Sequence, residues 1–417
     1  MAYGRNRVIY QSEALFVGPT PSTGQQHTGV ATYSATVGWN TTRQLHRIQT
    51  ANYSFNIDRT DVNQFGELAA IDRVNLDTPT VSLDFSYLLA NLGNEQNLGF
   101  VIDGSSTCVR NIINKDQDDK NYFIRTSKEG VDAILDTTNI NTANFESSTI
   151  GVGNGFLTSY STEAAVGGFP TCSVNVEALN MTFQNDISGD NPAINPEDGT
   201  RISASLFDFQ LPTATGSIDT GDLMVSVLRP GDITFSFTKR SAESEHLGDD
   251  LGSNLYDAPG AKLGDGTNAE HAKIQSYSIS LDLPREPILK LGSRYAFTRE
   301  ITFPVTVSMT VDALVADLNA GSLNDLVNCD EAYDLQVNLL RPTNCAGASN
   351  KDIFVQYRLK NAKVNSQSFS SDIGSNKSVT FEFSSQIGGP NQANQGLYMS
   401  GIAPGNLGLA QDASAQQ

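Results

Sequence analysis

The stretch that decides the fold spans residues 48–92 and reads IQTANYSFNIDRTDVNQFGELAAIDRVNLDTPTVSLDFSYLLANL. The chain repeats it without a gap at residues 274–318 as IQSYSISLDLPREPILKLGSRYAFTREITFPVTVSMTVDALVADL, a shift of 226 positions. The two copies share 13 identical residues in 45 aligned positions. Self-similarity of this length indicates a duplicated unit.

A second match follows each copy and sets the limits of the unit. Residues 173–177 (SVNVE) match residues 378–382 (SVTFE) at a shift of 205, so the second copy is predicted to be 21 residues shorter (226 − 205). The chain of 417 residues is therefore predicted to hold two domains, 1–215 and 216–417. The first carries an insertion at about 93–153, expected on the outer surface, and the second ends in a flexible tail.

Both copies alternate apolar and polar residues in the manner of strands. Residues 52–58 place Tyr53, Phe55 and Ile57 between polar side chains, and the copy at 277–283 keeps the same alternation. Such a period of two predicts a sheet with one buried and one solvent-exposed face. Residues 80–87 repeat the pattern. The fold class is therefore mainly β, in two tandem domains.

Two features interrupt the strands. The connectors 59–79 and 285–304 are about 20 residues long, whereas plain hairpins need only two to five loop residues, so they are expected to reach beyond the domain or to carry extra structure. A short flanking helix is expected after the second strand of each copy, at residues 88–92 and 313–327.

The composition excludes several classes of partner. The net charge is −19, and a surface of that sign repels nucleic acid, so DNA binding is disfavoured. No run of 18 apolar residues occurs, which predicts no membrane partner. The first ten residues lack the apolar core of a signal peptide, which indicates folding in a cytoplasm.

Residues with catalytic or ligand-binding spacing are scarce. No zinc spacing links the histidines, and neither a nucleophile elbow nor a phosphate-binding loop occurs, so no catalytic, cofactor-binding or metal residue is predicted. The acidic loops 186–198 and 249–265 could hold calcium, but neither has the spacing of an EF-hand, and solvated loops are predicted. The cysteines are predicted to be free thiols, mostly buried. The four histidines are His27, His46, His246 and His271, and the four cysteines are Cys108, Cys172, Cys329 and Cys345.

Arginines recur at the same places in both connectors. Arg59 matches Arg285, and Arg73 matches Arg299. A bidentate partner across a subunit boundary would explain arginine rather than lysine at these positions. An ion pair within one domain, at the end of a strand, would explain it equally well.

Three segments resemble the tail-tube (major tail) proteins of long-tailed bacteriophages. They are the opening YQSEALFVG at 10–18, the hairpin built from GFLTSYS at 155–161 with AVGGFPT at 165–171, and the passage from strand to helix at 301–327. The resemblance implies a β-sandwich with a flanking helix in each half, whose inner sheets join around a ring and line a tube. The ungapped repeat resembles duplicated chains of which three make a pseudo-hexameric ring.

The resemblance also implies a function. The chain would be a structural virion protein and not an enzyme, polymerising without a cofactor into stacked trimeric rings that form the tail tube. This tube is a negatively charged conduit for DNA delivery, carrying −57 formal charges per ring (3 × −19). Partners would be the tape measure, the terminator and a sheath, with DNA only in passage. The protein would be made in the host cytoplasm and reside in the virion tail.

Two sets of residues are expected to serve the tube. Acidic and hydroxyl side chains on the exposed strand faces would line the lumen: Asp58, Ser82, Asp84, Asp282, Thr310 and Asp312. The repeated arginines would lie between subunits: Arg59, Arg73, Arg285 and Arg299. The long connectors would pack against the neighbouring ring.

Two other classes remain open from the sequence. One is a different virion component on a related β-sandwich, such as a head-completion, baseplate or decoration protein, which would stay a small oligomer without a capsid. The other is a β-sandwich enzyme or carbohydrate-binding module. This last class needs exposed aromatic residues grouped on one face, yet the sole tryptophan, Trp39, lies in a polar loop context.

Overall fold

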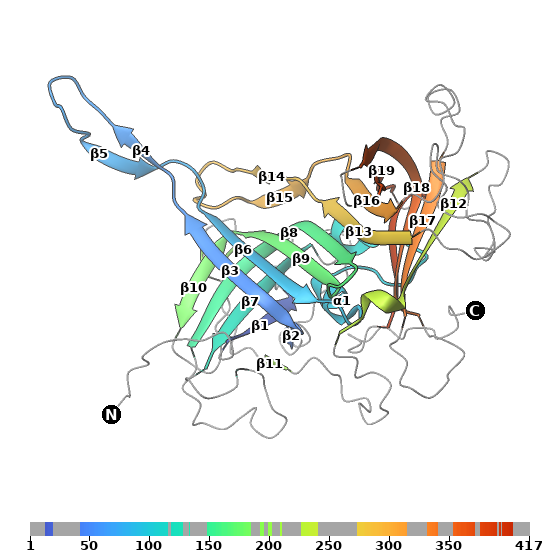
Figure 1. Cartoon of the computed structure of the whole chain (residues 1–417). Coiled ribbons are helices and arrows are strands. Elements are labelled where there is room, and N and C mark those ends of the chain that lie inside the picture. Colours follow the sequence, from blue (N-terminus) through green and yellow to red (C-terminus); the bar gives the residue numbers. More distant parts are fainter. Residues whose placement is uncertain are drawn as a thin grey trace.

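The protein is mainly β, as seen in a computed structural model of the whole chain (Figure 1). The structure describes residues 13–19, 42–115, 118–127, 133, 148–184, 192–195, 199–201, 209–210, 227–240, 273–314, 332–340, 353–371, 376–389, 392 and 394–402. Within these residues a 16-stranded sheet is accompanied by two separate two-stranded hairpins. None of the helices in this part of the chain has the length and apolar character needed to span a membrane.

The first half contributes strands and two short helices. They are β1 (Glu13–Pro19), β2 (Thr42–Gln44), β3 (Ile48–Asn56), β4 (Arg59–Val62), β5 (Asp72–Asn75), β6 (Thr80–Leu88), α1 (Gly93–Leu98), α2 (Arg110–Ile113), β7 (Asp119–Thr126), β8 (Ser148–Ala165), β9 (Thr171–Ala178), β10 (Asn180–Gln184) and β11 (Phe209–Gln210). The second half begins with a 3₁₀ turn at Pro230–Asp232 and continues with strands. They are β12 (Ile233–Arg240), β13 (Lys273–Asp282), β14 (Arg285–Ile288), β15 (Thr298–Ile301), β16 (Thr306–Leu314), β17 (Ala332–Leu340), β18 (Ile353–Ser370), β19 (Ser378–Gln386) and β20 (Gly396–Gly401).

The pairing scheme of the first half recurs in the second. The order β3-β6-β9-β8-β7-β1, with β10 also on β8, corresponds to β13-β16-β19-β18-β17-β12, with β20 also on β18. Each half also has a two-stranded hairpin, β4/β5 between β3 and β6 and β14/β15 between β13 and β16. The two sets are joined where β8 pairs with β13, so one sheet runs through both halves.

The strand register corrects the alignment of the second match. Leu88 lies opposite Thr171 in the first half, and Leu314 lies opposite Ser378 in the second. The leucines are 226 positions apart and their partners 207, so the predicted shift of 205 was wrong by two residues. Side chains alternate with a period of two along a strand, so a slip of two keeps every residue on its own face. The sequence pattern therefore could not detect it.

Two long strands bend in the same way and connect two parts of the sheet. In β8 a bulge lies between Leu157 and Ser159, and in β18 the corresponding bulge lies between Val364 and Ser366. Before each bulge, Asn154 (φ 53°) and Asn361 (φ 56°) take the left-handed conformation. A bulge sharpens the local twist and turns the strand. The residues before the bend pair with β7 or β17, and those after it pair with β9 or β19.

The main hydrophobic cluster of the core has members from both halves. Within it, the hydroxyl groups of Tyr160 of β8 and Tyr357 of β18 form a hydrogen bond of 3.1 Å. The division into two domains at 215/216 stays a prediction, because the described strands share one sheet and one core. The predicted flexible tail is a strand in its first part, since β20 pairs with β18 and is largely buried.

The expected outer surface of residues 93–153 is wrong for the described part of that stretch. Helix α1 is largely buried, and β7 lies between β1 and β8 with seven of its eight residues buried. The error came from polar residues that lie inside, among them Glu95, Lys120 and Asn121. The helix expected at 88–92 begins instead at Gly93, because Leu88 still belongs to β6. The helix expected at 313–327 starts with two residues of β16 and otherwise falls outside the described residues.

Candidate assembly surface

A polar face covers eight neighbouring strands in the order β3-β6-β9-β8-β13-β16-β19-β18. Its side chains alternate with buried ones, as in β6, where Ser82 and Asp84 lie between the buried Val81, Leu83 and Phe85. The register places Ser82 between Ser54 and Glu177, and Thr310 between Ser278 and Glu382. A row of hydroxyl and carboxylate groups thus crosses from one half to the other. We call this surface the polar face.

Carboxylates on the polar face are held by neighbouring hydroxyl groups. Asp312 accepts hydrogen bonds from Ser276 and Thr380, and Glu382 accepts one from Ser366 at 2.9 Å. Six acids belong to the face by register: Asp84, Glu163, Glu177, Asp282, Asp312 and Glu382. Among the described positions of this face the register adds two lysines, Lys363 opposite Ser384 and Lys273 opposite Leu314. The polar face is therefore predominantly acidic.

The residues expected to line a lumen lie mostly on this one face. Ser82 and Asp84 of β6, Asp282 of β13, and Thr310 and Asp312 of β16 all point to it by register. Asp58 follows the end of β3, is exposed, and accepts a hydrogen bond from Asn56 at 2.9 Å. Whether the face lines a channel stays a prediction.

The two halves meet at the junction, which is the pairing of residues 159–165 of β8 with residues 276–282 of β13. On the polar face, Ser161 lies opposite Ser280. On the opposite face, Tyr160 lies opposite Leu281, and Thr162 lies opposite Ile279. All four of these opposite-face residues are at most 1% exposed. The junction is a fully formed interface between two similar units.

β8 and β13 pair with each other at the junction, but the matching strand edges, those of β18 and β3, have no such partner among the described strands. Among the described strands β3 pairs with β6 alone, and residues 363–370 of β18 pair with β19 alone. Tyr53, Phe55 and Ile57 are 38%, 61% and 39% exposed. The residues 226 positions later, Ile279, Leu281 and Leu283, are 1%, 0% and 0% exposed. Matching positions are thus buried where β13 is paired and open where β3 is not.

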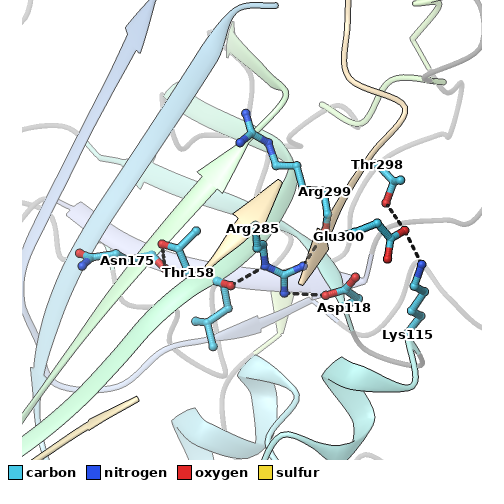
Figure 2. A network of polar contacts seen from close by, with 9 residues as sticks. Lys115, Asp118, Thr158, Asn175, Arg285, Thr298, Arg299 and Glu300 are labelled. Carbon is cyan, nitrogen blue, oxygen red and sulfur yellow. Dashed lines mark hydrogen bonds and ion pairs between the residues drawn. The ribbon is translucent and has the colours of Figure 1, made fainter. Parts of the chain in front are cut away.

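The hairpin 285–301, here the second arm, crosses the junction and lies against the first half (Figures 1 and 2). Figure 2 shows the Arg285 guanidinium pointing at Asp118, and the two groups form an ion pair of 2.6 Å. Arg285 also donates to the Leu157 carbonyl at 2.7 Å and to the Arg299 carbonyl at 3.0 Å. Its side chain is 0% exposed. A buried guanidinium with three acceptors fixes the arm to the β8 bulge.

Further contacts hold the second arm to the first half. Arg299 forms an ion pair with Glu177 of β9, and Lys115 forms one with Glu300. Ala296, which is 0% exposed, packs in a small apolar cluster with Tyr295 of the arm and three residues of the first half, Phe156, Leu179 and Ile194. Burial raises the pKa of Asp118, and the nearby Arg285 opposes that rise.

Among the described residues, the hairpin 59–75, here the first arm, has no such contacts with the other half. It projects away from the sheet (Figure 1), and every residue of β4 and β5 is exposed. Arg73 forms an ion pair of 2.6 Å with Asp61 of the same hairpin. Ala70, the counterpart of the buried Ala296, is exposed as well. At the tip, Phe65 and Leu68 are fully exposed.

The four repeated arginines therefore fall into two groups. Arg285 and Arg299 pair with acids of the other half of the same chain, while Arg59 and Arg73 lie on the exposed first arm. A role between subunits stays a prediction for all four. The sequence does not identify Asp118 and Glu177 as the partners of these arginines. Asp116, Asp118 and Asp119 belong to the stretch 93–153, for which the sequence predicts an outer surface.

The described residues contain no cluster that could hold a metal ion. His46 is partly buried, and burial together with Arg47 lowers its pKa to about 4. Cys108 and Cys172 are buried free thiols whose pKa values burial raises. Cys329, Cys345, the other three histidines and Trp39 fall outside the described residues. Most of loop 186–198 and all of loop 249–265 do so too.

Three solved structures are similar to parts of this chain. The SPP1 tail tube shares 12% identity over 51% of this chain and 96% of its own, with a TM-score of 0.26. The anti-feeding prophage baseplate shares 14% over 41% and 93%, with a TM-score of 0.23. An Hcp protein shares 11% over 41% and 98%, with a TM-score of 0.21. No family model and no curated protein matches. Scores this low assign no family, so what the chain does is inferred from its own residues.

Proposed function

We propose that this chain is a self-assembling structural protein whose copies join edge to edge into closed rings, which stack into a tube. Each copy offers two open edges, β3 and the end of β18, that correspond to the two edges joined at the junction. Such an interface is heterologous, because two different surfaces of the protomer meet. A heterologous interface forms a ring when the rotation from copy to copy closes.

One observation carries this proposal. Tyr53, Phe55 and Ile57 are open to solvent, whereas their counterparts Ile279, Leu281 and Leu283 are covered at the junction. An exposed edge strand with apolar side chains is a template for pairing and is rarely left open in a monomer. A second copy would cover the edge of β3 if its β18 paired with β3 in the way that β8 pairs with β13 within the chain.

The finer claims follow from this arrangement. Each chain carries two similar units from an ancestral duplication, so three chains give a ring with six such units. The polar face would then line the lumen, where its carboxylates keep DNA from binding during passage. The tail tube of a bacteriophage virion, with tape-measure and terminator proteins as partners, fits this design. We place Asp84, Asp282 and Asp312 in its wall.

Electron microscopy of the purified protein at rising concentration tests the proposal. We expect rings with three chains each and, at higher concentration, stacked tubes. A protein that remains monomeric at all concentrations, or that forms compact dimers, would count against it and would favour another virion component such as a decoration protein.

A substitution at the open edge of β3 distinguishes assembly through this interface from nonspecific aggregation. Phe55→Lys places a charge on the edge of β3, so ring formation should be lost while the circular dichroism of the monomer is unchanged. The matched control is Phe183→Lys on β10, because Phe183 is similarly exposed (63% against 61%) and lies away from both open edges. Rings should form normally with this control.

A further inference from the structure

We propose that the interface between two copies repeats the internal junction residue for residue, with Ser54 of one copy opposite Ser368 of the next and the first arm laid across the β18 bulge. This inference rests on the proposed function, because it specifies the partner surfaces through which copies join. It goes further, since it fixes a register and a docking site for the first arm.

The register follows from two shifts that the structure provides. Residues of β3 correspond to those of β13 at 226 positions, and residues of β8 correspond to those of β18 at 207. The bulges confirm this alignment, because Ile48/Thr50 matches Ile274/Ser276 and Leu157/Ser159 matches Val364/Ser366. β3 and β18, which would pair between copies, therefore have bulges at the same places as β13 and β8, which pair within the chain.

Applying both shifts to the junction gives the new pairs. Ser161 opposite Ser280 becomes Ser368 opposite Ser54 on the polar face. On the other face, Thr162 opposite Ile279 becomes Phe369 opposite Tyr53, and both of these aromatic residues are exposed in the isolated chain, by 46% and 38%. An aromatic pair across antiparallel strands stabilises their pairing. The pair would cover the apolar side of both open edges.

The arm has a docking site of the same kind. Arg59 takes the place of Arg285, and the Val364 carbonyl takes the place of the Leu157 carbonyl that Arg285 binds at 2.7 Å. Arg73 takes the place of Arg299, whose partner Glu177 corresponds to Ser384. Glu382 lies two residues from Ser384 on the same face, about 7 Å along the strand, within the range of a guanidinium. We infer that Arg73 exchanges Asp61 for Glu382 when copies join.

Several contacts of the second arm are not repeated, among them the ion pair with Glu177 and the contact with the Phe156 ring. The Phe156 ring, which lies under the Arg285 guanidinium at 5.2 Å, corresponds to Lys363. The docking of Arg59 therefore lacks this cation–π contact. Arg59 should consequently bind its site on the next copy more weakly than Arg285 binds its site within the chain. A weaker contact suits an interface that forms during assembly.

Disulfide crosslinking tests the register. A chain with Ser54→Cys mixed with a chain with Ser368→Cys should form a covalent dimer on oxidation, because the Cβ atoms of directly opposite residues are about 4.5–5.5 Å apart, a distance that small backbone movements bring within reach of a disulfide. The internal control is one chain with Ser161→Cys and Ser280→Cys, which has the same strand geometry and should form an intramolecular disulfide. Ser54→Cys mixed with Ser370→Cys is the off-register control and should crosslink poorly.

The possible outcomes separate the register from the function. Rings without the Ser54–Ser368 crosslink, or with preferential crosslinking at Ser370, would overturn the register and leave ring formation intact. Absence of both rings and crosslinks, in a sample where the internal control oxidises, would overturn both proposals. With Ser54→Cys and Ser368→Cys in one chain, the covalent ladder should stop at three chains.

Paired arginine variants test the arm. Arg59→Ala should raise the concentration needed for assembly about tenfold or more, since a buried, hydrogen-bonded charge is lost, and should leave the melting temperature of the monomer unchanged. Arg285→Ala should instead lower that melting temperature, because it leaves Asp118 buried without its cation. An unchanged assembly threshold for Arg59→Ala would exclude the proposed docking site.

Discussion

At the scale of single residues, Glu95 is the buried carboxyl group that connects the two halves of the core. It is 0% exposed and accepts hydrogen bonds from the Tyr87 hydroxyl at 2.7 Å and from the Tyr160 hydroxyl at 3.1 Å. Tyr160 in turn contacts Tyr357 of the second half. Burial raises the pKa of Glu95 from 4.5 to about 7, and the hydrogen bonds oppose the rise.

This shift predicts that the stability conferred by Glu95 falls as pH rises. The folded chain keeps the Glu95 proton up to about pH 7, whereas the unfolded chain loses it near 4.5, so the unfolded chain binds fewer protons in between. The contribution is complete below pH 4.5 and is lost as pH rises through about 7. The loss should amount to roughly 3 kcal/mol of unfolding free energy.

Urea unfolding at several pH values, compared with Glu95→Gln, measures this effect. The amide does not titrate, so the variant should lack this part of the pH dependence and should gain stability relative to the wild type as pH rises. Parallel curves for the two proteins across the whole window would refute the assignment.

At the scale of elements, the two arms have the same hairpin construction and opposite surroundings. Gly66 (φ 91°) and Gly292 (φ 89°) take the same left-handed conformation in the two turns, where a glycine is least strained. Both tips carry exposed apolar residues, with Phe65 and Leu68 on the first and Leu291 on the second. The bases lie along the ring in our proposal, so the tips are free to contact the next ring.

The double variant Phe65→Ser, Leu68→Ser should therefore separate ring formation from stacking. Rings should form at normal concentration, because the arm base and the edge strands are unchanged, while tubes should be shortened or absent. Tube length in negative-stain images provides the measurement. Tubes of normal length would show that the first tip takes no part in stacking.

At the scale of the whole molecule, charge and strand alternation combine in one surface. The chain carries a net charge of −19, and six of its acids lie on the polar face. Hydroxyl groups bind two of these carboxylates, Asp312 and Glu382, and the face offers few cations for phosphate groups. A conduit for a polyanion needs such a wall, because each cation that neutralises a phosphate adds affinity.

Reversing two of these charges should make the tube bind DNA. Tubes of Asp84→Lys, Asp312→Lys should retain double-stranded DNA in cosedimentation at about 50 mM salt and release it at about 200 mM, since phosphate contacts are strongly salt-dependent. Asp103→Lys is the control, because Asp103 is an exposed acid outside the eight strands of the polar face, and this variant should bind far less. Equal DNA binding by both variants would show that the polar face does not line the lumen.

The sequence by itself determined the features that depend on local periodicity. The repeat of 48–92 at 274–318 predicted two matching sets of strands, and the alternation around Ser82 and Thr310 predicted which side chains share the polar face. Both predictions need only the period of two of an extended chain, which neighbouring residues specify. For the same reason a slip of two residues in the second match leaves the alternation of side chains unchanged.

Tertiary structure alone decided which edges and charges are covered. Arg59 and Arg285 lie in matching sequence positions, yet one is exposed and the other is 0% exposed, because the β8 bulge and Asp118 come from a distant part of the chain. Polar residues such as Glu95 and Asn121 lie inside where the sequence predicts a surface, since they have partners distant in sequence, Tyr160 and Asn154. Burial depends on these long-range contacts, and the local pattern of residues does not contain them.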